Sequence, residues 1–169
     1  DSIIQASDGI MVARGDLGVE IPPEEVPTYQ RYMIEKCRKY GKPVITATQM
    51  LDSMTHNPFP TRAEVSDVSW AIEQGSDAVM LSGESASGEY PIESVNMQTR
   101  IAKEVEKHFN YERSSYQAFE TSNKRVNDAI AAAVSDTAIL INAKLIICFS
   151  VSGQTGVRIS RTRPICPVF

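Results

Sequence analysis

The sequence lacks the marks of several protein classes. No apolar run reaches about 18 residues, the length that a transmembrane helix needs, so we expect no membrane span. The first residues show no basic start followed by an apolar stretch, so no signal peptide is predicted. The chain also begins with Asp1 rather than Met, and we expect it to start within a longer protein.

Cysteine and histidine are scarce. The three cysteines form no CxxC or Cys/His cluster, and the two histidines lie far apart, so neither a disulfide framework nor a zinc site is predicted. We expect reduced, buried thiols, which favours a cytoplasmic protein. Seventeen Lys and Arg against 21 Asp and Glu give a net charge of -4, which argues against nucleic-acid binding.

Three short apolar runs, at residues 9–13, 43–48 and 78–82, follow one another at the spacing of a βα unit. Each is apolar on both faces, as in a buried parallel strand. Helices are predicted over about 22–40, 61–74 and from Pro91 onward, the last with one apolar face consisting of Ile92, Val95, Ala102, Val105 and Phe109. This α/β pattern fits a doubly wound sheet or a (β/α)8 barrel, and a complete barrel needs roughly 250 residues.

The pattern changes after residue 109. Residues 110–125 are polar and aperiodic, and they predict a linker between domains 1–109 and 110–169. Beyond it we predict a helix over 127–142, with Ile130, Val134, Ala138 and Ile141 in step, a strand over 145–149 and a turn over 150–155. A short helix and the start of a further strand complete the prediction.

Polar residues follow each predicted strand. Asp16, between two glycines, follows the first run, Thr48 the second, and Ser82 and Glu84 the third. Each alone is typical of a turn or helix cap, but parallel strands end at one edge of a sheet, where α/β enzymes place their sites. Glycine-rich turns bind anions and carboxylates bind Mg²⁺. The residues therefore predict an α/β enzyme that acts on a small anion with Mg²⁺.

Four longer motifs resemble pyruvate kinases in sequence, order and interval. They are Ile10-Met-Val-Ala-Arg-Gly-Asp-Leu-Gly18, Pro43-Val-Ile-Thr-Ala-Thr-Gln-Met-Leu51, Pro60-Thr-Arg-Ala-Glu64 and Val79-Met-Leu-Ser-Gly-Glu84. The resemblance implies that residues 1–109 are the last three βα units of a catalytic TIM (β/α)8 barrel. Residues 110–169 would be the first part of an α/β open-sheet regulatory domain.

The resemblance also implies a reaction. Pyruvate kinases are glycolytic enzymes that transfer a phosphoryl group from phosphoenolpyruvate to ADP, giving pyruvate and ATP, with Mg²⁺ or Mn²⁺ and usually K⁺. It implies that Asp16 binds the metal and that the N–H groups of Gly15 and Asp16 contact the substrate carboxylate. Thr48 would touch the substrate, and Ser82 would lie on the proton path to the enolate with support from Glu84.

The resemblance further implies regulation and assembly. Ser150, Ser152, Gly153 and Thr155 resemble the loop that binds the phosphate of sugar-phosphate activators in many family members. The family is usually tetrameric, and Arg62 would lie near a subunit contact. The family's catalytic Lys, second metal carboxylate, nucleotide contacts and most K⁺ ligands lie upstream of Asp1, so we expect the chain alone to be inactive.

Two other functions remain open. One is a related barrel lyase that cleaves a carbon–carbon bond through a metal-bound enolate, against which the Pro-Thr-Arg-Ala-Glu and Ser-Gly-Glu motifs argue. The other is a non-catalytic module that binds a sugar phosphate at residues 150–155 without turning it over.

Overall fold

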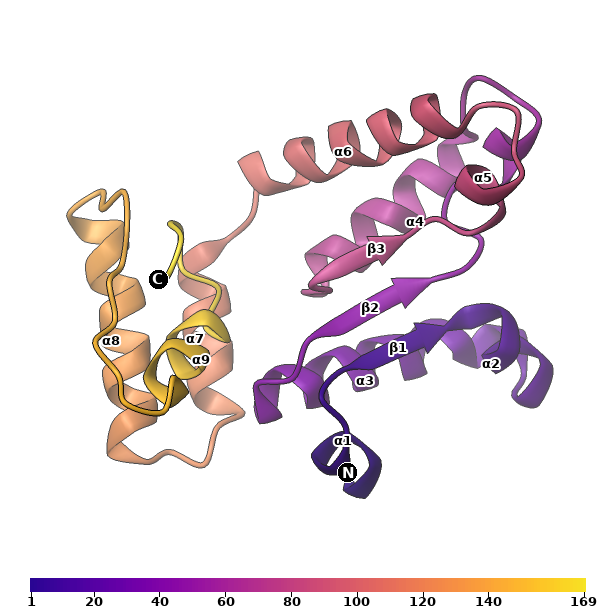
Figure 1. Cartoon of the computed structure of the whole chain (residues 1–169). Helices are drawn as coiled ribbons and strands as arrows, with labels where there is room; N and C mark the ends of the chain where they lie inside the picture. Colours follow the sequence, from indigo (N-terminus) through magenta and orange to yellow (C-terminus); the bar gives the residue numbers. More distant parts are fainter. The chain divides into compact units, whose positions relative to one another are not determined.

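The computed structural model describes all residues from 1 to 169 (Figure 1). It divides into two compact units, Asp1–Phe109 and Asn110–Phe169. No helix combines the length and the apolar character that a membrane span requires.

The first unit contains the three predicted strands as one parallel sheet in the order β1-β2-β3. The strands are β1 (Ile10–Ala13), β2 (Val44–Ala47) and β3 (Ala78–Met80). Helices alternate with them along the chain, so the prediction of an α/β fold with parallel strands is confirmed. The right-handed crossover rule for such units explains why the intervening helices pack back onto the sheet.

The sheet has one buried face and one open face. Val12, Val44 and Thr46 are at most 1% exposed and face the helices, whereas Met11 is 51% and Met80 is 36% exposed. Burial of both faces was expected from the apolar runs, and this is wrong for the chain by itself. The apolar side chains of this face are exposed because nothing in these 169 residues covers them, as expected for an incomplete barrel.

Helix α3 (Val26–Tyr40) follows a 3-10 turn, η1 (Pro23–Glu25), and the two elements together occupy the helix predicted over about 22–40. Its buried residues recur at helical spacing: Gln30, Ile34 and Cys37. Gly41 ends the helix in a left-handed conformation with φ +67°, and its N–H donates to the carbonyls of Arg38 and Cys37. Ile34 and Cys37 join Ile4, Val12 and Val44 in one hydrophobic cluster.

Helix α4 (Arg62–Glu73) begins with a capping box formed by Thr61 and Glu64, which explains its sharp start. It packs with α6 (Pro91–Lys107), which also contacts η2 (Asp52–Thr55). The second cluster of the unit lies between these elements and consists of Met50, Leu51, Met54, Val68, Ala71 and Ile101.

The predicted apolar face of α6 is wrong in its first half. Ile92 is 71% and Val95 is 50% exposed, and the buried residues are Ser94 and Ile101. The helix turns toward the core a face that begins with small Ser94, which lets it approach closely. A hydrophobic pattern alone could not reveal this choice, because Ser94 scores as polar.

Four short helical elements were not predicted. They are α1 (Ser2–Ala6), α2 (Arg14–Glu20), η2 and α5 (Gly83–Ala86). Helices α2 and α5 directly follow β1 and β3, at the strand ends where candidate site residues occur. The predicted turn around Gly15 and Asp16 is therefore the first turn of α2.

The second unit contains α7 (Tyr111–Glu120), α8 (Val126–Leu140) and α9 (Gln154–Ser160). The linker predicted over 110–125 is wrong for most of its length, because α7 occupies it. Asn110 caps this helix through its Oδ1, which accepts the Arg113 N–H at 2.8 Å. The buried residues of α7 are Ser114, Ser115 and Ala118, so its packing face is small and polar and escapes a hydrophobic pattern.

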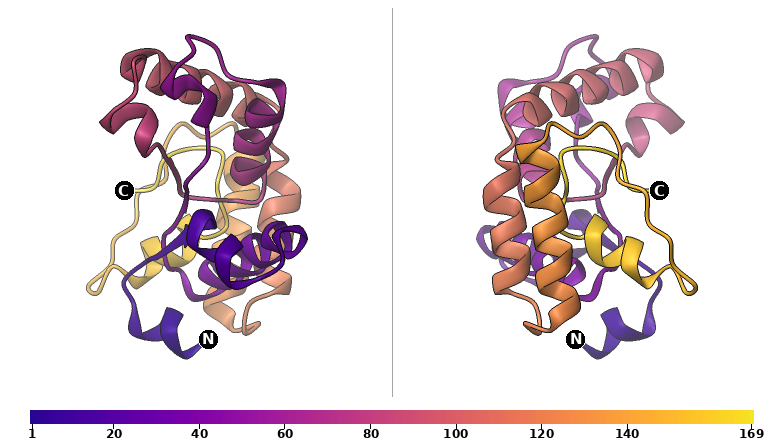
Figure 2. Two further views of the ribbon diagram at one scale, coloured as in Figure 1. Left: turned by 90° about the vertical axis from the view of Figure 1, so that its right-hand side faces the viewer. Right: turned by 90° about the vertical axis from the view of Figure 1, so that its left-hand side faces the viewer.

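Helices α7 and α8 lie side by side, as Figure 2 shows. The buried residues of α8 are Asp128, Ala131, Ser135 and Ala138, whereas Ile130 and Ile141 are exposed. Of the apolar series predicted for this helix, only Ala138 is buried and Val134 half-buried. Small side chains on both helices allow the close contact.

The strand predicted over 145–149 does not form as such. Residues 145–149 and 166–169 meet only in a single parallel bridge, Ile146 with Val168. Three backbone hydrogen bonds link these segments: the Ile146 N–H donates to the Pro167 carbonyl, the Cys148 N–H to the Phe169 carbonyl, and the Phe169 N–H to the Ile146 carbonyl. Phe149 is 96% exposed, so this apolar segment has neither a second neighbour nor a cover.

Candidate active site

The carboxyl ends of the three strands lie together at one edge of the sheet (Figure 1). The register pairs Ala13 with Ala47 and Ala47 with Met80. Asp16, Thr48 and Ser82 follow these aligned ends within a few residues. The structure therefore gathers these three predicted residues at the same edge.

Thr48 is tied to α2. Its Oγ1 accepts the Gly15 N–H at 2.8 Å, across 33 residues of sequence. Thr48 has φ +70° and Gln49 has φ +51°, so two successive non-glycine residues adopt the left-handed conformation. A β-branched residue rarely adopts it, and such strain costs on the order of 1–3 kcal/mol per residue and is typical of functional sites.

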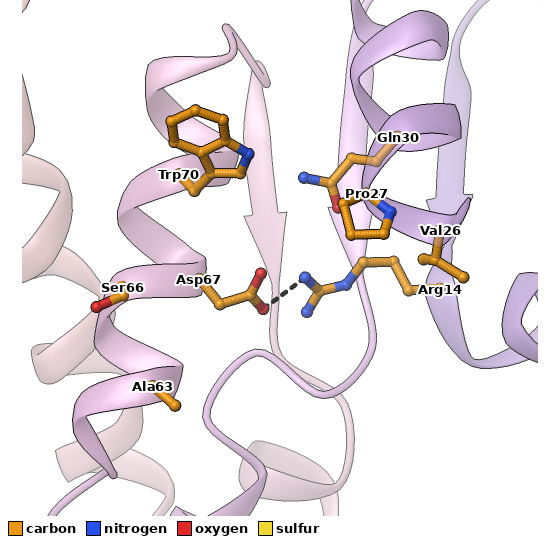
Figure 3. Close-up of a pocket in the computed structure, with 8 residues that line it drawn as sticks. All are labelled: Arg14, Val26, Pro27, Gln30, Ala63, Ser66, Asp67 and Trp70. Carbon is orange, nitrogen blue, oxygen red and sulfur yellow. Dashed lines mark hydrogen bonds and ion pairs between the residues drawn. The ribbon is translucent and has the colours of Figure 1, made fainter. Parts of the chain in front are cut away.

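Arg14, which the sequence analysis did not single out, contacts the same turn. Its Nη2 donates to the carbonyls of Thr48 at 2.7 Å and Gln49 at 3.0 Å and lies 2.9 Å from Met50 Sδ, and its Nε donates to Thr48 at 3.2 Å. Its Nη1 pairs with Asp67 Oδ2 of α4 at 2.5 Å, the dashed line in Figure 3. The only sequence feature that could have identified Arg14 is its position directly after a predicted buried strand.

A cavity of about 410 Å³ lies beside this ion pair, between α3 and α4 (Figure 3). Trp70 and Asp67 line it from α4, and Gln30 and Pro27 line it from α3. Gln30 Nε2 donates to Gln74 Oε1 at 2.8 Å. The lining also includes Arg14, Val26, Ala63 and Ser66, but none of the predicted catalytic residues.

Glu84 anchors backbone. It is 2% exposed, its Oε1 accepts the Leu51 N–H at 3.0 Å, and its Oε2 accepts the Ser82 N–H at 2.8 Å. Both carboxylate oxygens are therefore engaged in joining the segment after β2 to the segment after β3. The Ser82 hydroxyl makes no hydrogen bond in the structure and stays available.

A second carboxylate, Glu64, braces the neighbouring loop. It accepts hydrogen bonds from the N–H and hydroxyl groups of both Ser53 and Thr61, at 2.6–2.8 Å. Burial by itself raises the pKa of Glu64, but the hydrogen bonds from Ser53 and Thr61 outweigh it and hold the pKa below the ordinary 4.5. The sequence analysis predicted neither the cap nor the bonds to Ser53.

Asp16 is the free carboxylate at this edge. It is exposed on the first turn of α2 and makes no hydrogen bond or ion pair. The structure contains no group of three His, Cys, Asp or Glu side chains that could hold a metal. Mg²⁺ typically binds to one or two carboxylates, with water and substrate oxygens as the remaining ligands. Asp16 fits such a site as one ligand.

The residues predicted to bind an effector belong to the second unit. Ser150, Ser152, Gly153 and Thr155 are all exposed, and their hydroxyls make no hydrogen bonds. Gly153 has φ +75°, and a Cβ added there would meet no atom within 4 Å. The loop is exposed to solvent, and no other side chain of the structure forms a hydrogen bond to these hydroxyls.

Two family models match the chain. The one described as "Pyruvate kinase, barrel domain" matches residues 1–95. The one described as "Pyruvate kinase, alpha/beta domain" matches residues 128–169. The first match alone covers more than half of the chain and includes every candidate residue of the strand ends.

Comparison with individual proteins gives the same family as the two family models. A pyruvate kinase of Sporosarcina psychrophila is 53% identical over 168 residues, covering 99% of this chain and 29% of the relative. One of Agrobacterium vitis is 53% identical over 169 residues, covering 35% of its length. A crystal structure of a pyruvate kinase from Cryptosporidium parvum superposes with a TM-score of 0.92 at 47% identity, over 99% of this chain and 34% of that one. The chain thus spans about a third of the proteins it matches.

Proposed function

The chain belongs to the pyruvate kinase family, and on that premise we propose that the protein containing it transfers a phosphoryl group from phosphoenolpyruvate to ADP. The products are pyruvate and ATP. The observation that carries the proposal is the alignment of Asp16, Thr48 and Ser82 at the ends of three adjacent parallel strands. These are the positions where barrel enzymes carry their reactive groups.

Asp16 holds Mg²⁺ or Mn²⁺ in this proposal, because its carboxylate is exposed and unengaged. When bound, the metal supplies positive charge that offsets the charge of two anionic substrates. The Asp16 N–H belongs to the first turn of α2, where backbone N–H groups lack intrahelical acceptors, and in this proposal it contacts the substrate carboxylate. The Gly15 N–H, assigned the same contact by resemblance, instead donates to Thr48 in the structure.

Thr48 donates a hydrogen bond to the substrate. Its Oγ1 already accepts the Gly15 N–H, so its own proton is free for an anionic oxygen. Ser82 relays the proton that converts the enolate into pyruvate, since its hydroxyl is uncommitted and half-buried. Glu84 holds Ser82 in place through the backbone N–H and does not itself transfer a proton.

Other parts of the proposal concern the longer protein. Most K⁺ ligands, the nucleotide contacts and the catalytic Lys belong in this proposal to the rest of the longer protein, so we expect the chain alone to be inactive. A cytoplasmic homotetramer is the proposed form, with Arg62 near a subunit contact, and the reduced cysteines agree with that compartment. A sugar phosphate is the proposed effector, bound by Ser150, Ser152, Gly153 and Thr155, whose free hydroxyls support this role.

The test is pyruvate formation by the full-length protein. Purified protein is incubated with phosphoenolpyruvate and ADP, with and without Mg²⁺ and K⁺, and pyruvate and ATP are measured. Equal amounts of both products, lost on chelation of the metal, are expected. Pyruvate from a longer 2-oxo acid without ATP would instead favour the barrel lyase. Binding of fructose 1,6-bisphosphate with no turnover of either substrate would favour the non-catalytic module.

A further inference from the structure

We propose that Arg14 is a positioning residue that holds Thr48 in its active conformation, and that Asp67 of α4 fixes Arg14 in turn. The inference rests on the proposed function, because it gives a purpose to the contact between Thr48 and substrate. It begins from the turn formed by Thr48 and Gln49, which is strained and needs a restraint.

The turn is strained at two successive residues. Thr48 has φ +70° and Gln49 φ +51°, and neither is glycine. Threonine is β-branched, so the left-handed conformation brings its side chain close to its own backbone. Such a conformation persists only where neighbouring groups hold it. The Gly15 N–H bond to Thr48 Oγ1 holds the side chain but leaves the two carbonyls to be fixed by another group.

Arg14 supplies that group. One guanidinium bonds the Thr48 carbonyl twice and the Gln49 carbonyl once, at 2.7–3.2 Å. Both carbonyls therefore point at one planar donor, and this arrangement fixes the orientation of the peptide between them. Lysine carries the same charge, but a single ammonium on a flexible stem cannot reproduce the fork.

Asp67 fixes the far side of the guanidinium. The Arg14 side chain is only 10% exposed, and its Nη1 meets Asp67 Oδ2 at 2.5 Å. The cavity of about 410 Å³ that both residues line gives the guanidinium room to swing away once the carboxylate is lost. The pair thus connects the end of β1 to α4 and locks the turn after β2 (Figure 3).

The test uses the full-length protein with Arg14→Lys, Asp67→Asn and a second-site change, Gln49→Asn. Asparagine adopts the left-handed conformation more readily than glutamine, so Gln49→Asn should hold the turn without the full clamp. Ser76→Ala is the matched control, because it removes the 2.6 Å hydroxyl pair between Ser76, which precedes β3, and buried Thr46 and leaves every contact of Arg14 intact. It should lower the unfolding temperature while the KM for phosphoenolpyruvate stays unchanged.

We expect Arg14→Lys to lower kcat/KM for phosphoenolpyruvate on the order of 100-fold, because misplacement of a substrate contact by about 1 Å costs that much. Asp67→Asn, which keeps an acceptor, should lose less. Adding Gln49→Asn to Arg14→Lys should restore much of the loss. Normal kinetics in Arg14→Lys would overturn the proposal, as would a loss that Gln49→Asn leaves unchanged.

Hydrogen–deuterium exchange separates this proposal from the proposed function. The Gly15 amide, bonded to Thr48, should exchange faster in Arg14→Lys and return toward the wild-type rate with Gln49→Asn. If the wild-type protein makes no pyruvate, the proposed function fails, but the exchange rates still decide whether Arg14 holds the turn. An unchanged Gly15 rate in Arg14→Lys would refute the clamp in either case.

Discussion

In both units a loop and a short helix follow an apolar segment, but only in the first unit do neighbouring elements form hydrogen bonds to that loop. After β2, the Thr48 turn is held by Gly15 and Arg14, and the Glu84 carboxylate joins the next two segments. In the second unit, the hydroxyls of residues 150–155 bond nothing. Polar residues in a loop thus become a shaped site only where neighbouring elements supply partners.

The reason lies in strand pairing. In the first unit, β2 has a parallel neighbour on each side, so loops from adjacent strands emerge together and bond one another. In the second unit, residues 145–149 share one bridge with residues 166–169 and have no further neighbour. A loop that follows a segment with a single neighbour has few adjacent loops to bond, so its polar groups stay exposed to solvent.

The largest effect that would test this contrast is the loss of the free carboxylate of the first unit. Asp16→Ala in the full-length protein should lower kcat/KM on the order of 1000-fold, because a metal that offsets substrate charge is worth several kcal/mol. Titration with Mg²⁺ and Mn²⁺ in a pyruvate assay measures it. Glu20→Ala, another exposed acid on the same helix, is the control. Equal activity of the two variants would show that Asp16 does not bind the metal.

The next effect concerns the buried carboxylate between two strand ends. Glu84→Ala leaves the Leu51 and Ser82 N–H groups without acceptors, and this should destabilise the edge by about 2–4 kcal/mol. Thermal unfolding and hydrogen exchange of residues 48–54 and 80–86 measure it. Glu89→Ala removes an exposed acid paired with His56 and should cost under about 0.5 kcal/mol. Unchanged exchange at both segments would show that Glu84 does not anchor them.

A smaller effect should appear on acidification. The pKa of Glu64 is lower in the folded chain than its ordinary 4.5, so the stabilisation is present above that pH and is lost as pH falls through the folded value. The protection of the start of α4 against hydrogen exchange, relative to the intrinsic rate at each pH, should therefore fall below about pH 4.5. Glu64→Gln should lack this pH dependence, whereas Glu73→Gln at the other end of α4 should keep it. A Glu64→Gln profile identical to wild type would contradict the assignment.

The smallest effect is expected from the exposed loop at residues 150–155 of the second unit, and it concerns effector binding. Thr155→Glu adds a negative charge where the effector phosphate is proposed to bind, and it should weaken calorimetric binding of fructose 1,6-bisphosphate by about tenfold or more. Gln117→Glu on exposed α7 is the control for charge. Both variants should unfold within about 0.5 kcal/mol of wild type. Unchanged affinity in Thr155→Glu would exclude this loop as the phosphate site.

Local patterns predicted most of the first unit. The three apolar runs predicted the strands, and the helices predicted over 22–40, 61–74 and from Pro91 onward correspond to α3, α4 and α6. These features depend on backbone preferences within a few residues, so no tertiary contact was needed to see them. The failures were α7, whose packing face is serine and alanine, and the strand at 145–149, which lacks partners.

The chemical groups at the strand ends can be read from the order of residues alone, because Asp16, Thr48, Ser82 and Glu84 follow apolar runs at a recognisable interval. The contacts that each group makes depend on how the chain folds. It turned Glu84 into a backbone anchor, left Asp16 free and brought Arg14 to the Thr48 turn across 34 residues. The physical reason is that hydrogen-bond partners distant in sequence are chosen by the packing of strands and helices, which no local pattern records.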